Sequence, residues 1–123
     1  MSTSVPAPPE QKLSLGRQLL RREVNERSRV AVRDGAAATE LLVLCECGRS
    51  RCAERFAVPT GIYDEVRRFP THFAVRTGHE AAEAERLVAE HEGFCIVEKY
   101  GAPGLATIGE QRRKLRLATL PRS

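Results

Sequence analysis

The sequence predicts an α+β fold, with a small mixed or antiparallel sheet, an N-terminal helix, one or two further helices and a loop that carries three cysteines. Short apolar or alternating runs bounded by Gly, Pro or Asp predict the strands, and apolar residues at helical spacing predict the helices. The 123 residues are enough for one domain. We expect that domain over residues 10–100, between a disordered N-terminus (1–9) and a C-terminal tail (101–123).

The composition excludes several classes of protein. Hydrophobic residues make up 41% and charged residues 29%, which is ordinary for a small soluble domain. No apolar run approaches the roughly 18 residues that a membrane helix needs. Residues 1–9 have neither a charged start nor an apolar stretch, so we expect no signal peptide and a cytoplasmic location. Four cysteines without an export signal favour metal or redox chemistry over disulfides.

Residues 10–29 are good helix formers and predict the N-terminal helix. Within this segment Leu13, Leu20 and Val24 form one narrow apolar stripe at helical spacing. We therefore expect a surface helix with this stripe as its apolar side, packed only through its second half.

Four short segments have the length and apolar pattern of strands. They are residues 41–45, 55–58, 73–76 and 94–99. The first is a continuous apolar run between turn signals, which is typical of a buried strand. We expect the sheet to be built from 41–45, 73–76 and 94–99.

Residues 61–69 predict a helix, with Thr60 as a candidate N-cap. Ile62, Val66 and Phe69 lie at helical spacing, so we expect these three side chains to cover one face of the sheet.

Residues 80–92 are compatible with two structures. Four residues of this segment lie at helical spacing: Ala84, Leu87, Val88 and His91. Gly93 then suits the end of a helix. The alternative is a hairpin in which residues 86–90 pair with 94–100, and the pattern leaves both structures open.

The charge is concentrated at the two ends of the chain. Residues 34–100 carry eight basic and twelve acidic side chains, whereas residues 101–123 carry five basic and one acidic. We expect the tail to be mostly flexible, with at most 110–117 helical. Its basic cluster is a candidate surface for a protein or nucleic-acid partner, although the acidic middle of the chain favours a solvated tail. The cluster consists of Arg112, Arg113, Lys114 and Arg116.

Three cysteines lie within eight residues and form the most informative motif of the chain: Cys45, Cys47 and Cys52. Residues i and i+2 of a strand point to the same side, so Cys45 and Cys47 can direct their sulfurs to one point. Gly48 allows the chain to bend back, and Cys52 can then return to that point. Because Zn²⁺ prefers four tetrahedral sulfur and nitrogen ligands, this spacing predicts a zinc-stabilised loop. The alternative is one buried core cysteine and two free loop thiols.

The fourth ligand is less clearly specified. Cys95 lies within an apolar strand, so we expect a buried core residue rather than a ligand. The candidates are His72, His79 and His91. His79 directly follows a Thr-Gly turn after a strand, so geometry favours it narrowly.

Several short motifs of the chain occur together as a recognisable pattern. They are Arg22-Glu23-Val24-Asn25-Glu26-Arg27, Cys45-Glu46-Cys47-Gly48, Cys52, Tyr63-Asp64-Glu65-Val66-Arg67, Phe73-Ala74-Val75-Arg76-Thr77-Gly78-His79-Glu80 and Phe94-Cys95-Ile96-Val97-Glu98-Lys99. This pattern resembles a group of small uncharacterised actinobacterial proteins with no established activity. The resemblance implies that residues 22–100 form one unit and that His79 is the fourth ligand. The chain departs from the group at Asp64 and Thr77, where Glu and Pro are usual.

These observations predict a zinc-binding interaction module without catalytic activity. No nucleophile elbow, phosphate-binding glycine loop or H-E-x-x-H motif is present, and no small-molecule substrate is evident. The alternative is a thiol-based redox or metal sensor that uses Cys47 and Cys52, whose pKa values nearby arginines would lower.

Overall fold

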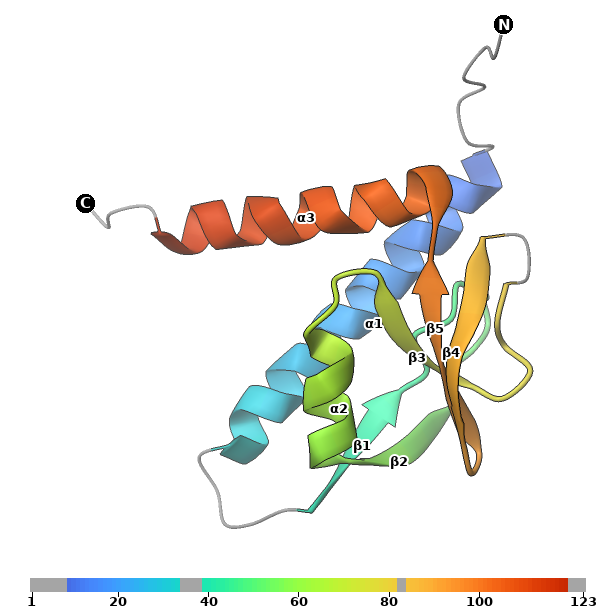
Figure 1. Ribbon diagram of the computed structural model, residues 1–123, viewed down its shortest axis with the longest axis vertical. Coiled ribbons are helices and arrows are strands. Elements are labelled where there is room, and N and C mark those ends of the chain that lie inside the picture. The colour runs from blue at the N-terminus through green and yellow to red at the C-terminus, as the bar shows by residue number, and fades with distance from the viewer. Residues whose placement is uncertain (1–8, 34–38, 82–83, 120–123) are drawn as a thin grey trace, which may run out of the picture.

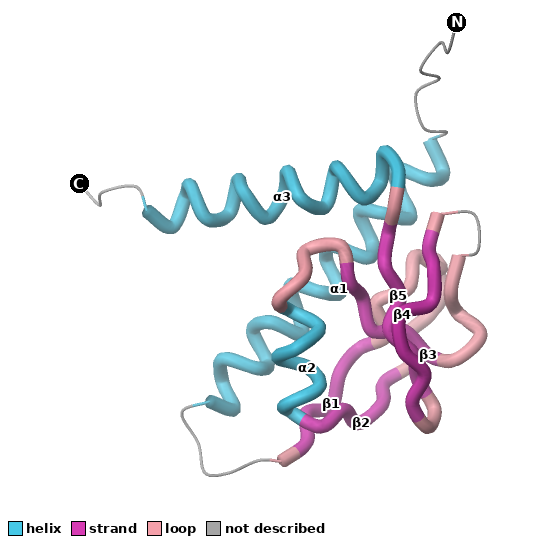
Figure 2. Tube along the Cα trace, viewed as in Figure 1, coloured by secondary structure: helices cyan, strands magenta, loops and turns pink. Residues whose placement is uncertain are grey.

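A computed structural model describes residues 9–33, 39–81 and 84–119, and it confirms the α+β fold class (Figures 1 and 2). In chain order its elements are α1 (Pro9–Arg33), β1 (Glu40–Leu44), β2 (Arg55–Pro59), α2 (Thr60–Arg67), β3 (His72–Arg76), β4 (Glu85–His91), β5 (Phe94–Lys99) and α3 (Gly101–Thr119). The disorder expected for residues 1–9 falls almost wholly outside the described residues, and Pro9 already belongs to α1.

The strands form two antiparallel sheets rather than the single sheet expected. One pairs β1 with β2, and the other has the order β3-β5-β4. The two sheets meet where β1 ends, because the N–H of Glu46 donates to the carbonyl of Ala74 (2.9 Å). The backbone pairing between the cysteine loop and β3 does not continue to Arg76, because the N–H of Arg76 donates to the sulfur of Cys45 (3.1 Å) instead of to a carbonyl. The cysteine loop thus joins two small sheets.

The hydrophobic core lies between the two sheets and α2. Phe56 of β2 stacks on Phe94 of β5, with ring centroids 5.2 Å apart. Helix α2 contributes Tyr63 and Val66, which are 1% and 3% exposed. The expected core role of Phe69 is wrong, because α2 ends at Arg67 and the Phe69 ring, 50% exposed, stacks on His72 instead.

The start of α2 also differs from the prediction. Thr60 is the first residue of the helix rather than its cap, and Pro59 occupies the N-cap position without a side-chain hydrogen bond. The hydroxyl of Thr60 donates to the carbonyl of Thr39 (3.4 Å) and so links α2 to the residue that precedes β1. Ile62 is half-buried against the core.

The segment with two compatible patterns is a hairpin. β4 pairs with β5 across a two-residue turn, in which Gly93 has a φ of +85° that favours glycine. The register shifts between Leu87 and Ala89, so Val88 is the extra residue of a bulge. This insertion gives the strand an apolar spacing that resembles a helix.

Helix α1 packs through a polar face, which corrects the prediction for its apolar stripe. Leu13 and Leu20 are 64% and 66% exposed. Gln18, Arg22 and Asn25 are instead buried, at helical spacing on the opposite side. On the side that meets β1, polar side chains of α1 form hydrogen bonds with the backbone of the cysteine loop.

The C-terminal segment is helical from Gly101, which corrects the expectation of a mostly flexible tail. Helix α3 lies across α1 in Figure 1, and Lys114 contacts the carboxylates of Glu23 and Glu26 on α1. Near β5, Gly104 approaches the backbone of Lys99, where a Cβ would lie 2.7 Å from the carbonyl oxygen. The sequence missed this helix because its three glycines and one proline lower helix propensity. Four of the basic residues expected to be flexible therefore lie on a packed helix.

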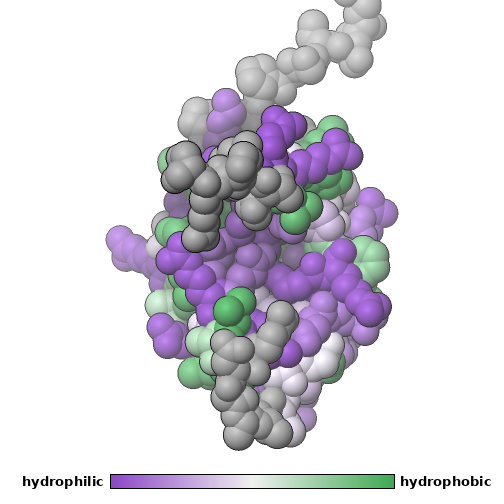
Figure 3. Space-filling model, turned by 90° about the vertical axis from the view of Figure 1, so that its left-hand side faces the viewer, coloured by the Kyte–Doolittle hydropathy of each residue, from purple (hydrophilic) through white to green (hydrophobic). Residues whose placement is uncertain are grey.

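The surface is mixed in character. On the face shown in Figure 3, apolar residues are scattered among hydrophilic ones. Among residues 9–33, 39–81 and 84–119, no helix is long and apolar enough to cross a membrane.

Candidate metal centre

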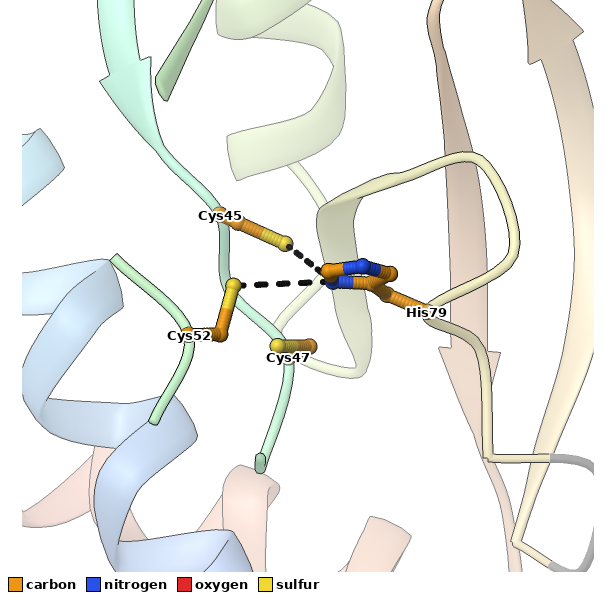
Figure 4. Close-up of side chains that lie close together, drawn as sticks. All are labelled: Cys45, Cys47, Cys52 and His79. Atoms are coloured by element: carbon orange, nitrogen blue, oxygen red, sulfur yellow. Dashed lines mark hydrogen bonds between the residues drawn. The ribbon is translucent and has the colours of Figure 1, made fainter. Parts of the chain in front are cut away.

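The four residues predicted as ligands come together in one cluster (Figure 4). One ligand atom from each of Cys45, Cys47, Cys52 and His79 lies within 4.8 Å of all the others. His79 Nδ1 is 3.6 Å from the sulfur of Cys45 and 3.5 Å from that of Cys52. A tetrahedral ion with bonds of about 2.3 Å to sulfur needs ligand atoms about 3.8 Å apart. Small side-chain adjustments therefore bring all four onto one ion.

The three cysteines belong to the loop between β1 and β2. Cys45 continues the β1–β2 pairing by one residue, since its N–H donates to the carbonyl of Glu54 (2.8 Å). A tight turn follows, in which the N–H of Cys52 donates to the carbonyl of Arg49 (3.3 Å). This turn returns Cys52 toward Cys45 and Cys47, which are 0% and 1% exposed.

His79 comes from the turn after β3. Gly78 has a φ of +90°, which favours glycine, and the N–H of His79 donates to the carbonyl of Arg76 (2.9 Å). On its far side, His79 Nε2 lies 3.1 Å from a carboxylate oxygen of Glu54. A proton on Nε2 bonded to Glu54 leaves the lone pair of Nδ1 directed at the sulfurs, an arrangement that is common for metal-binding histidines.

The local hydrogen bonds favour the thiolate form in which cysteine binds metals. The hydrogen bond from the Cys45 thiol lowers the pKa of Cys47 to about 4, and the backbone N–H of Arg49 contributes in the same direction. The same contact with Cys47, together with burial, raises the pKa of Cys45. The hydrogen bond between the two cysteines thus favours the thiolate at Cys47 and the thiol at Cys45.

Gly48 is required by packing rather than by backbone conformation. Among the described residues a positive φ occurs at Gly78, Gly93 and Gly101, so the bend expected at Gly48 does not need the left-handed region. A Cβ at Gly48 would instead lie 1.7 Å from the hydroxyl oxygen of Ser14 on α1. Helix α1 thus packs directly against the cysteine loop.

Four polar side chains of α1 bind the backbone of the loop. Asn25 Nδ2 donates to the carbonyl of Leu44, and the N–H of Leu44 donates to Asn25 Oδ1 (both 2.8 Å). Further along, Gln18, Arg21 and Arg17 donate to three successive carbonyls, at 3.1, 2.5 and 2.7 Å. These carbonyls belong to Glu46, Cys47 and Gly48. Buried backbone groups need partners, and α1 supplies them where the ladder of β1 has ended.

Glu46 is a fully buried carboxylate between the two metal-site cysteines. Its oxygens accept hydrogen bonds from Arg67 (2.5 Å), the N–H of Ala74 (2.9 Å) and Asn25 (2.8 Å). It therefore ties the loop to α2, β3 and α1 at once. Our sequence interpretation missed this residue and its partners. The available signal was the polar stripe of Gln18, Arg22 and Asn25 on α1.

The other candidate ligands lie elsewhere. His72 contacts Glu98 (3.5 Å), and His91 stacks on Phe94 with centroids 4.8 Å apart. Cys95 is 2% exposed in the core, as expected, and burial raises its pKa to about 11. Its thiol is therefore neutral near pH 7.

Two hollows on the surface differ in character. One, of about 420 Å³, opens beside the metal centre, and its lining includes Cys52, His79, Arg49 and Arg51. The other, of about 740 Å³, is mainly apolar and lies between α2 and the β4–β5 hairpin. The metal centre is therefore reached from solvent on the side of Cys52.

Comparison with protein-family models, curated proteins and solved structures finds no match for this chain. The geometry of the site is therefore the basis for the function proposed below.

Proposed function

We propose that this chain is a small zinc-binding interaction module that works within a protein or nucleic-acid assembly. Zn²⁺ held by Cys45, Cys47, Cys52 and His79 would fix the β1–β2 loop to the turn after β3. The observation that supports this most is the convergence of the four ligand atoms within 4.8 Å. Three sulfurs and one imidazole nitrogen match the preference of zinc, whereas Mg²⁺ and Ca²⁺ prefer oxygen ligands.

The proposed role is structural rather than catalytic. Four protein ligands complete a tetrahedral shell and leave no position for water or substrate, whereas catalytic zinc sites have three. A chain of 13.6 kDa also has a modest core, so metal binding can supply much of the free energy of folding. The metal thus acts as a cross-link between the two sheets.

Metal analysis of the purified full-length chain tests this proposal. We expect one zinc per chain, and we expect Cys47→Ser to lower that ratio to well below one. Cys95→Ser is the matched control, because Cys95 is equally buried but lies outside the cluster. Absence of stoichiometric zinc in the unmodified chain, or equal loss in both variants, would overturn it.

One observation supports a second candidate, a redox sensor. Cys52 lines the hollow beside the site, whereas Cys45 and Cys47 are buried. A peroxide could therefore oxidise Cys52 first, and Cys47 could then complete a disulfide. The two thiolates lose two electrons, the peroxide is reduced to two waters with uptake of two protons, and zinc leaves. Stoichiometric zinc release by mild peroxide, together with a Cys47–Cys52 disulfide found by mass spectrometry of peptides, supports this role; zinc retention contradicts it.

A further inference from the structure

The metal loop is surrounded by arginines from two parts of the chain. Arg49 and Arg51 belong to the loop itself and line the hollow of about 420 Å³. Arg17 and Arg21 reach the loop from α1, where they donate to the carbonyls of Gly48 and Cys47. We call these four residues the arginine face.

The arginine face has few negative charges to neutralise it. Glu54 is the carboxylate that lines the same hollow, and it is already engaged with His79 (3.1 Å) and Arg76 (3.9 Å). A zinc ion with three thiolates adds one negative charge. Four arginines against these two negative charges leave a positive surface. Arg49 donates to the carbonyl of Gly78 (2.9 Å), and among the described residues none forms a hydrogen bond or an ion pair with the Arg51 side chain.

We propose that the arginine face binds the phosphate backbone of nucleic acid. This proposal names the partner of the zinc module and therefore rests on the proposed function. The guanidinium group presents several donors in a planar fork that suits phosphate. The hollow between Arg49 and Arg51 offers a recess in which a phosphate can approach both side chains.

The charge of the face, and the surroundings of its loop part at Arg49 and Arg51, favour nucleic acid over an acidic protein. Protein interfaces have an apolar centre, with aromatic or aliphatic anchors. Around Arg49 and Arg51, between Val43 and Arg68, no large apolar side chain is exposed, whereas Leu13 and Leu20 are exposed on α1 about one turn from Arg17. Nucleic-acid interfaces are more polar and more positive, and phosphate contacts alone can sustain them. The absence of an exposed aromatic residue in this range also predicts binding without base stacking or sequence preference.

The basic cluster on α3 fits this role less well, although the sequence drew attention to it. Lys114 contacts Glu23 and Glu26, and Arg113 pairs with Glu110 (2.8 Å). At least two of its four charges are thus neutralised within the chain. This makes α3 a useful control surface with the same residue types.

Binding of the zinc-loaded full chain to labelled nucleic acid tests the proposal. The probes are a random-sequence DNA duplex and a single strand of the same length. Fluorescence anisotropy measures the binding of each probe over a range of salt concentrations. Four phosphate contacts predict a slope of log K against log salt of about −3 to −4 on the duplex. We expect Arg49→Gln with Arg51→Gln to weaken binding at least tenfold and to flatten the slope by about 2. Arg112→Gln with Arg113→Gln should change binding less than threefold.

Zinc content and circular dichroism of each variant separate the outcomes. Arg51→Gln alone serves as a second variant, because among the described residues it removes no hydrogen bond or ion pair and should leave the fold intact. A zinc-loaded chain that does not bind either probe overturns the nucleic-acid proposal and leaves the zinc module standing. Stronger loss from the α3 pair, or equal competition by poly-glutamate at matched charge, also overturns it. A chain without zinc overturns the proposed function first.

Discussion

Glu54 and Glu46 are two carboxylates that support the metal centre without belonging to the ligand cluster. Glu54 contacts the outer nitrogen of His79, and Glu46 holds the peptide between Cys45 and Cys47 in place. The first acts on the orientation of one ligand, and the second on the position of the whole loop. Substitutions at the two positions should therefore have different effects.

Glu54→Ala should weaken zinc binding with little effect on the fold. Its side chain is 49% exposed, so its removal costs little stability, whereas loss of the partner of a histidine ligand typically lowers metal affinity about 10- to 100-fold. Competition with a chelator measures the affinity, and Glu65→Ala, at an exposed position of α2, is the control. An unchanged affinity would show that Glu54 does not orient His79.

Glu46→Gln should instead destabilise the folded chain. The substitution removes the nearest carboxylate partner of the largely buried Arg67 guanidinium and leaves Glu26 at 3.9 Å, and breaking a buried ion pair costs about 3–5 kcal/mol. Urea unfolding of the zinc-loaded protein measures this free energy. A loss below about 1 kcal/mol would mean that Arg67 finds another partner and that Glu46 is not the connection we describe.

At the scale of the element, α1 determines the position of the cysteine loop through polar contacts. Gln18, Arg21 and Asn25 bind consecutive parts of the loop backbone, and Gly48 lies against Ser14. Gln18 and Asn25 are buried because they supply hydrogen bonds to this backbone.

Gly48→Ala should lower stability, whereas Gly109→Ala on α3 should raise it. The new Cβ at position 48 would overlap the Ser14 hydroxyl, and such overpacking costs about 1–3 kcal/mol. At Gly109 no atom lies within 4 Å of a new Cβ, and alanine stabilises a helix by about 1 kcal/mol relative to glycine. Thermal unfolding compares the two. Adding Ser14→Ala to Gly48→Ala should recover part of the lost stability. If it does not, the overlap with the Ser14 hydroxyl is not the cause of the loss.

Much of the element order could be predicted from the sequence because strands and the helix over 60–67 have strong local patterns. The cysteine cluster was also predictable, since alternation in a strand places Cys45 and Cys47 on one side. The division into two sheets could not be predicted. It depends on one backbone hydrogen bond from Glu46 to Ala74 and on the sulfur of Cys45, which accepts the N–H of Arg76. The buried side of α1 was misassigned, because apolar periodicity says nothing about polar side chains that bind a loop.

At the scale of the whole molecule, α3 packs against α1 and approaches β5. It contacts α1 through Lys114 and β5 through Gly104, which lies against Lys99, and Thr107 in its first half is 0% exposed. The C-terminal helix therefore belongs to the folded unit.

Truncation after Tyr100 should lower the melting temperature by at least about 4 °C, the shift that about 1 kcal/mol gives in a small domain. Lys114→Gln alone should have a much smaller effect, because its side chain is one-third exposed and partly solvated ion pairs contribute little. Scanning calorimetry of the two variants provides the comparison. An unchanged melting temperature on truncation would show that α3 only rests on the surface.

Zinc X-ray absorption spectroscopy of the full-length protein tests the central claim most directly, because it reports the atoms that bind the metal. The cluster of Cys45, Cys47, Cys52 and His79 predicts three sulfurs at about 2.3 Å and one imidazole nitrogen at about 2.0 Å. His79→Ala should remove the imidazole signal and keep the three sulfurs, whereas His72→Ala should change nothing. A shell dominated by oxygen, or an imidazole signal that persists without His79, would contradict the site described for this protein.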